Sequence, residues 1–142
     1  MRKPLKILFV SRDLFPPFRV DVAVLFGKEM VKKGHRIDWV LQSQDERKKG
    51  YKAVWAGGAA WVGPSDNGKS FIHRLHRHLV GFLHNVACIR LLFRKHYDIV
   101  QVKDRFFTAV LYLIMAKVLD RKFFYWLSYP FAEASLYEIQ AK

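Results

Sequence analysis

The sequence contains a single cysteine, Cys88, and no long uninterrupted run of apolar residues. One cysteine cannot form an internal disulfide, which indicates a reducing compartment. The longest apolar run, 106–116, is interrupted by Thr108 and is shorter than the ~20 residues that a membrane-spanning helix needs. No cleavage site of small residues follows the basic N-terminus, so no secretory signal is evident. These absences exclude a disulfide-stapled secreted domain and a polytopic membrane protein, and they predict a cytoplasmic protein.

Acidic residues are also scarce. The 142 residues include 12 Asp and Glu against 25 Lys and Arg, which gives a formal net charge of +13. A surface of this charge favours a polyanion: anionic lipid headgroups, a phosphate-bearing substrate or nucleic acid. Nucleic acid is the least favoured of the three, because no zinc-finger spacing, helix-turn-helix or aromatic RNA-stacking motif is visible. An apolar content of 51% excludes a disordered chain and suffices for one core.

The stretch from Lys6 to Gln42 predicts a βαβ unit. Four consecutive apolar residues, Ile7–Val10, suit a strand that is covered on both faces. Two prolines then turn the chain, and helical periodicity runs from Asp21, a candidate N-cap, to Gly34, a candidate C-terminal stop. The apolar run 37–41 follows as a parallel strand. Functional groups in such sheets gather at the carboxyl ends of the strands, which here means 11–21 first.

Strands and helices continue to alternate along the rest of the sequence. We expect strands at 51–55, 97–102 and 123–127 and helices at 71–96, 106–119 and 131–142, with 57–64 as a loop or a bulged strand. This order predicts one α/β domain, residues 1–142, with a doubly wound, mainly parallel sheet of Rossmann-like topology.

The helix predicted at 71–96 has two contrasting faces. Apolar residues recur every three or four positions from Phe71 to Phe93, which favours a face packed on the sheet. Arg74, Arg77 and Arg90 lie on the opposite face. We expect these arginines to contact an anionic membrane surface, because each basic group close to such a surface contributes about 1 kcal/mol. The protein would then be peripheral on the inner face of the membrane.

Residues Gly63–Ser70 match the phosphate-binding pattern GxxxxGKS. Such a loop holds phosphates with backbone N–H groups and a lysine, and magnesium with the hydroxyl. Pro64 removes one of those amides, and Asp66 places negative charge where phosphate would lie. The other interpretation is a polar loop in which Ser65 or Asn67 caps the following helix. A P-loop-like nucleotide-binding domain remains an alternative function.

Candidate metal ligands and catalytic groups are few. The histidines of the long predicted helix lie among arginines without a nearby cysteine or acid, so we predict no metal site. Acids and one hydroxyl near the predicted strand ends are the candidate catalytic residues: Asp21, Asp104, Ser128 and Glu133.

Four stretches together resemble the N-terminal domain of family 4 glycosyltransferases: Lys6–Ser11, Phe15–Pro17, Lys33–Ile37 and Tyr97–Gln101. These enzymes have the GT-B architecture, in which two Rossmann-like domains face a cleft, and the likeness extends from Lys6 to about Pro130. The resemblance implies sugar transfer from a nucleotide-sugar donor to an acceptor without an essential metal. It implies that this chain is the acceptor-binding half and that the acceptor is a cell-surface glycan, lipid-linked in many such enzymes.

The same resemblance implies a partner and a set of substrate contacts. The donor would bind to a C-terminal domain or to a separate catalytic chain, so we expect a truncated chain or a split subunit that is inactive alone and holds no cofactor tightly. A non-catalytic membrane-docking subunit is a further alternative. The family tends to have a Gly-Gly pair after the two prolines, and this chain has Phe18, Arg19, Val20 and Asp21 there instead. The candidate substrate-binding residues are Asp13, Phe18, Arg19, Lys103 and Tyr129.

Overall fold

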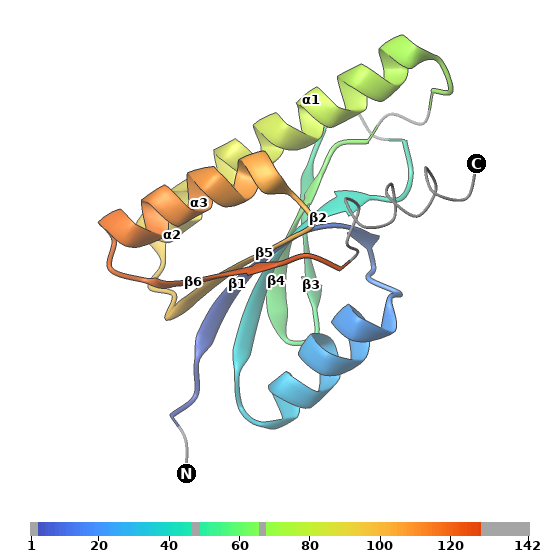
Figure 1. Ribbon diagram of the computed structural model, residues 1–142. Coiled ribbons are helices and arrows are strands. Elements are labelled where there is room, and N and C mark those ends of the chain that lie inside the picture. Colours follow the sequence, from blue (N-terminus) through green and yellow to red (C-terminus); the bar gives the residue numbers. More distant parts are fainter. Residues whose placement is uncertain (1–2, 47–48, 66–67, 129–142) are drawn as a thin grey trace, which may run out of the picture.

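The computed structural model describes residues 3–46, 49–65 and 68–128 (Figure 1). In this part of the chain, the strands form one sheet in the order β3-β4-β2-β1-β5-β6, with every neighbouring pair parallel except β3 and β4. The doubly wound, mainly parallel α/β prediction is confirmed. The elements are β1 (Lys6–Phe15), η1 (Asp21–Met30), β2 (Arg36–Ser43), β3 (Tyr51–Trp55), β4 (Gly58–Gly63), α1 (Phe71–Cys88), α2 (Arg90–Arg94), β5 (Ile99–Lys103), α3 (Phe106–Val118) and β6 (Lys122–Trp126).

Helices cover both faces of the sheet. The helix η1 lies on one face, and α1, α2 and α3 lie on the other (Figure 1). Alternate residues of β1 therefore enter two different cores: Leu8 and Val10 pack under the three α-helices, and Ile7 and Phe9 pack under η1. All four are buried. The uninterrupted apolar run in the sequence reflects this double coverage.

The helix after β1 begins differently from the prediction. It is wound as a π-helix, its N-cap position is Val20, and no side chain caps it. Asp21 is therefore the first helical residue and not the N-cap, because its carboxylate pairs with cations at the sheet edge instead. The predicted stop is confirmed: Gly34 has φ +85°, and its N–H donates to the carbonyl of Val31 at 2.9 Å.

Residues 58–63 form a regular strand, which the glycines in the sequence concealed. Ala56 and Gly57 have positive φ angles of 48° and 73° and make a tight hairpin between β3 and β4. Gly58 is needed because β4 approaches β2 closely: a Cβ there would lie 1.6 Å from the carbonyl oxygen of Ile37. The glycines therefore mark a turn and a close backbone approach and do not mark a loop.

The predicted helix 71–96 is divided in two. α1 ends at Cys88, and the N–H of Ile89 donates to the carbonyl of Val86 at 3.1 Å, a tight i−3 bond that separates α1 from α2. Cys88 is buried, and burial raises the pKa of its thiol to about 12.

The apolar stripe of α1 does not pack on the sheet, contrary to the prediction. The buried residues of α1 are the small or polar Gly81, Asn85 and Cys88. Small residues let the helix lie close to the strands, and this contact rotates the apolar stripe outward. The exposed members of the stripe are Phe71, Leu75, Leu79, Val86 and, on α2, Phe93. Within the described residues, none of the helices is both long and apolar enough to cross a membrane.

Candidate functional site

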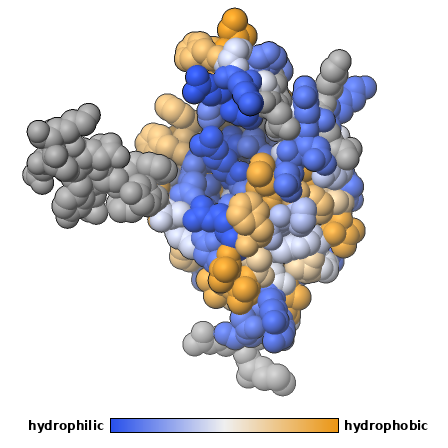
Figure 2. Space-filling model, turned by 90° about the vertical axis from the view of Figure 1, so that its right-hand side faces the viewer, coloured by the Kyte–Doolittle hydropathy of each residue, from blue (hydrophilic) through white to orange (hydrophobic). Residues whose placement is uncertain are grey.

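The carboxyl ends of β1, β5 and β6 lie side by side at one edge of the sheet. Ser11 of β1 is in register with Lys103 of β5, and Lys103 is in register with Trp126 of β6. The loops that leave these strands therefore converge, as expected for a parallel sheet. Figure 2 shows a face of the molecule on which hydrophilic residues are prominent in the upper middle, with apolar residues at the top, in the lower half and at the right-hand edge.

Lys103 is the buried centre of this edge. Its side chain is fully buried, and its Nζ lies 3.1 Å from Asp13 Oδ2 and 3.2 Å from Asp21 Oδ2. The ammonium also lies 5.1 Å from the centre of the Trp126 ring. A buried ammonium requires such partners, because its desolvation is otherwise uncompensated. Lys103 thus holds the C-terminal part of β1 and the start of η1 against β5.

Arg19 lies among three carboxylates. Its Nε is 3.4 Å from Asp21 Oδ1 and 4.0 Å from Asp13 Oδ1, and its Nη1 is 4.0 Å from Asp104 Oδ2. The side chain is 44% exposed, so part of the guanidinium still faces solvent. Because these acids already surround Arg19, its guanidinium is a weaker ligand for an anionic substrate than an unpaired arginine would be.

Asp104 joins the end of β5 to the end of β6. It has φ +55°, and its carboxylate accepts hydrogen bonds from the Ser128 backbone N–H at 2.7 Å and the Ser128 hydroxyl at 2.5 Å. Its own N–H donates to the carbonyl of Trp126 at 3.0 Å. A non-glycine residue in the left-handed region is uncommon, and Asp tolerates it better than most residues do.

A cavity of about 510 Å³ opens above these residues, and we name it the edge cavity. Most of the candidate residues from the sequence border it or lie directly beneath it, whereas Tyr129 and Glu133 lie outside the described residues. Among the described residues, no group of three or more His, Cys, Asp or Glu side chains is placed to hold a metal ion. The edge cavity is lined by Arg12, Asp13, Phe18, Arg19, Asp104 and Ser128, among others.

Sequence reasoning missed three basic residues beside the edge cavity. A second cavity of about 380 Å³ shares Arg12 and Asp104 with the first and is also lined by His78 and Arg105. Arg12 directly precedes Asp13 and Arg105 directly follows Asp104, two residues that we selected near strand ends, so the strand-end rule could have found both. His78 comes from α1, whose orientation the periodicity did not reveal.

The loop that matches the phosphate-binding pattern connects β4 to α1, so a strand, a loop and a helix are present in the required order. The hydroxyl of Ser70 caps α1 by accepting the His73 N–H at 3.4 Å, in place of the predicted caps Ser65 and Asn67. Residues 66–67 lie outside the described residues. Lys69, the lysine of the pattern, is exposed.

Of the three arginines that we expected at a membrane surface, Arg74 and Arg90 are exposed and Arg77 is half-buried.

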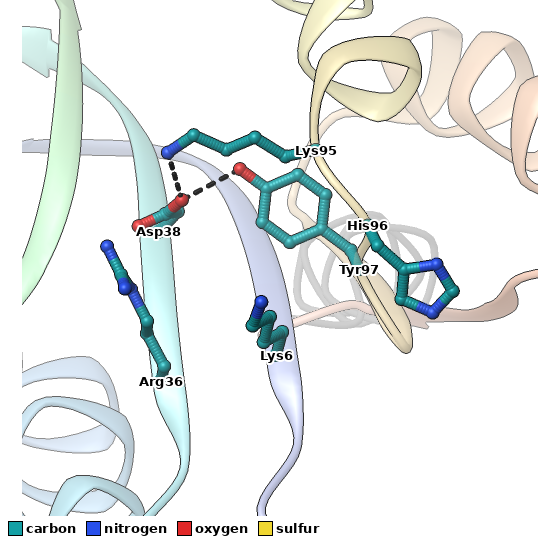
Figure 3. A pocket seen from close by; sticks show the side chains of 6 residues that line it. All are labelled: Lys6, Arg36, Asp38, Lys95, His96 and Tyr97. Carbon is teal, nitrogen blue, oxygen red and sulfur yellow. Dashed lines mark hydrogen bonds and ion pairs between the residues drawn. The ribbon is translucent and has the colours of Figure 1, made fainter.

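A further cavity, of about 230 Å³, lies at the opposite edge, where the strands begin (Figure 3). Asp38 accepts hydrogen bonds there from Lys95 Nζ at 2.9 Å, Tyr97 Oη at 2.8 Å and the Ala59 N–H at 3.0 Å. Burial raises the pKa of Asp38, but its bonds to Lys95, Tyr97 and Ala59 outweigh burial and leave that pKa below the usual 3.8. Because the carboxylate is buried and already accepts these three hydrogen bonds, we assign this cluster to stability.

We expect Asp38→Asn to lower the free energy of unfolding by about 2 kcal/mol at neutral pH, since hydrogen bonds to a charged group are lost. The pKa of Asp38 is depressed by folding, so its contribution is fully present above pH 3.8 and is lost as pH falls through the folded pKa. Urea unfolding at several pH values should show the difference from wild type shrinking below about pH 4. The exposed Asp45→Asn is the control, and an unchanged difference at low pH would contradict the assignment.

The fold and the edge site define the class of the domain as Rossmann-like, with its candidate site at the carboxyl edge of a parallel sheet. No protein-family model and no curated protein matches the sequence. Among solved structures, the chain is similar to the calicheamicin glycosyltransferase CalG4, with a TM-score of 0.56 and 18% sequence identity. The match covers 99% of this chain and 38% of that chain. At this identity the likeness concerns the fold, and the chain spans well under half the length of that enzyme.

Proposed function

We propose that this chain is the acceptor-binding half of a GT-B glycosyltransferase similar to family 4, and that a second domain or a separate chain supplies the nucleotide-sugar donor. One observation carries the proposal: a fold shared with a glycosyltransferase has its polar cavity at the carboxyl edge of the sheet, where such folds bind ligands. The sequence resemblance over 6–130 supports the same assignment, and the share of the longer enzyme that is matched fits one half of a two-domain architecture.

The edge cavity offers groups that bind and orient sugar hydroxyls. Asp104 borders both cavities, and a carboxylate there would accept a hydrogen bond from the acceptor hydroxyl and later its proton. Asp13 and Asp21 are held by the buried Lys103, so their part would be to shape the loop after β1. Phe18 is exposed and lines the cavity, where an aromatic ring would pack against the apolar face of a sugar.

The test is a titration of the isotope-labelled chain followed by backbone NMR. We expect millimolar saccharide acceptors, free and lipid-linked, to shift the amides of 11–13, 104 and 128. A nucleotide sugar alone should shift none of them, because the proposal assigns the donor to a second domain or a separate chain. Residues at the opposite edge, such as Arg36 and His96, are the internal control. Shifts by ATP at 63–70 would instead favour the P-loop alternative. A panel of saccharides that leaves the edge cavity unchanged would refute the proposal.

We further propose that the chain rests on an anionic membrane surface through the outward faces of α1 and α3. Both helices lie on the same side of the sheet and contact each other (Figure 1). Arg74, in the first turn of α1, and Arg90, the first residue of α2, are exposed, and the net charge of +13 favours an anionic partner. The exposed apolar residues are Ile72, Leu75, Leu79 and Leu83 of α1 and Val110, Leu113, Ile114 and Val118 of α3.

A further inference from the structure

The cavity of about 380 Å³ beside the edge cavity, which we name the arginine cavity, combines cations with aromatic rings. Arg12 comes from the end of β1, Arg105 precedes α3, and His78 comes from α1, so three separate elements bring basic groups to one space. Phe82, Phe106 and Phe107 supply the apolar part of the lining. The space also contains the first turn of α3, whose initial amides have no partner within the helix.

Positive charge predominates among the residues that line the arginine cavity. Among the described residues, no acid forms an ion pair with Arg12 or Arg105, and the buried Nε of Arg105 has no hydrogen-bond partner. Asp104 also lines this cavity and supplies one negative charge against the two arginines, and its carboxylate accepts two hydrogen bonds from Ser128. Gly81 of α1 leaves room for the guanidinium: a Cβ there would lie 3.3 Å from Arg105 Nη1.

The pKa values of Arg105 and His78 are both lowered in this positively charged surrounding. Burial, and next the charge of Arg12, lowers the pKa of Arg105 to about 10. Burial, followed by the charges of Arg12, Arg105 and Arg77, lowers the pKa of His78. Both groups would hold their protons more tightly beside an anion, because an opposite charge favours the charged form.

We propose that the arginine cavity binds the phosphate group of an amphiphilic ligand, with the apolar part of that ligand lying across Phe106 and Phe107. Two guanidinium groups, an imidazole and the start of a helix present many donors, which suits the several oxygens of a phosphate better than the two of a carboxylate. The two rings are 66% and 76% exposed, so an alkyl group would find apolar surface next to the phosphate.

This inference rests on the proposed function in one respect: it assigns the ligand as the phosphate-bearing end of the acceptor. The arginine cavity and the edge cavity share Arg12 and Asp104, so one molecule can occupy both, with its sugar in the edge cavity and its phosphate beside Arg105. The acceptor class is then a phosphate-linked saccharide with an apolar chain.

Calorimetric titration of the whole chain with hexyl phosphate, inorganic phosphate and hexyl glucoside tests the inference. We expect hexyl phosphate to bind about tenfold more tightly than either of the others, since it alone carries both the charge and the chain. Arg12→Gln should weaken the binding of hexyl phosphate about tenfold, because it removes a charge-assisted contact. Phe107→Ser should weaken it severalfold and leave the binding of inorganic phosphate unchanged. Arg36→Gln, at the opposite edge, is the matched control and should change neither affinity.

The other outcomes contradict the inference separately from the proposed function. Equal affinities for hexyl phosphate and inorganic phosphate would contradict the claim that the ligand is amphiphilic and would identify free phosphate as the ligand. Equal affinity for the glucoside, no measurable binding, or an unaffected Arg12→Gln variant would overturn the phosphate site itself. If hexyl phosphate binds but no saccharide binds in the edge cavity, the phosphate site is supported and the proposed acceptor-binding function is contradicted. If saccharides bind in the edge cavity but hexyl phosphate does not bind, the acceptor-binding function is supported and the phosphate site is contradicted.

Discussion

Replacing Lys103 with methionine should lower the free energy of unfolding by about 3–5 kcal/mol, because two carboxylates would lose the buried cation that neutralises them. The ammonium is fully buried, with Asp13 and Asp21 at 3.1 and 3.2 Å. Methionine fills a similar volume, so the loss measures the charge and not a cavity. Urea unfolding of wild type and of the Lys103→Met variant at neutral pH measures this difference in the free energy of unfolding. This loss is of the same order as the whole stability of a small domain, and it would loosen the loop that lines the edge cavity.

Two variants keep this prediction testable. Lys117→Met removes an exposed lysine from α3 and should change stability by less than about 0.5 kcal/mol. Asp21→Asn added to Lys103→Met should recover part of the loss, because it removes one of the uncompensated carboxylates. A loss below about 1 kcal/mol for Lys103→Met, or no recovery in the double variant, would show that the buried pair does not organise this edge.

The topology was predictable because a few local patterns are unambiguous. A four-residue apolar run is buried on both faces in a doubly wound sheet, and Gly34 with positive φ ends the first helix as expected. The location of the candidate site followed from topology alone, since the carboxyl ends of parallel strands meet at one edge. That rule placed Asp13 and Asp104 near each other although they are far apart in the sequence.

Other features depended on tertiary contacts that one sequence does not encode visibly. The glycines of β4 suggested a loop, but Gly58 serves a backbone approach to Ile37 that exists only in the folded sheet. The stripe of α1 was correctly periodic, but periodicity does not say which face packs inward. Gly81 and Asn85 decided that question by letting α1 lie close to the sheet. The excess of positive charge in the arginine cavity could not be predicted either, because only the folded chain brings Arg12 and Arg105 to one cavity.

The reversal of α1 changes the physical basis of the membrane proposal, because the apolar stripe, and not the opposite face that carries Arg74, is turned outward. With the apolar stripe packed inward, arginines alone would have attracted lipid, at about 1 kcal/mol each. With the stripe outward, apolar side chains would also enter the headgroup region. Leu75, Leu79 and Leu83 are each more than half exposed, so burying what remains of each would contribute about 1 kcal/mol. Together these leucines should matter about as much as the charges.

Changing Leu75, Leu79 and Leu83 to glutamine should therefore weaken binding to vesicles with one-third anionic lipid about 100-fold, which corresponds to about 3 kcal/mol. Arg74→Glu with Arg90→Glu should weaken it at least tenfold, and added salt should reduce the binding of wild type. Flotation with increasing lipid concentration measures both changes. Val54→Gln, an exposed apolar residue on β3, is the control. If the three glutamines leave vesicle binding unchanged, the outward face of α1 does not contact the lipid surface, which contradicts the membrane proposal.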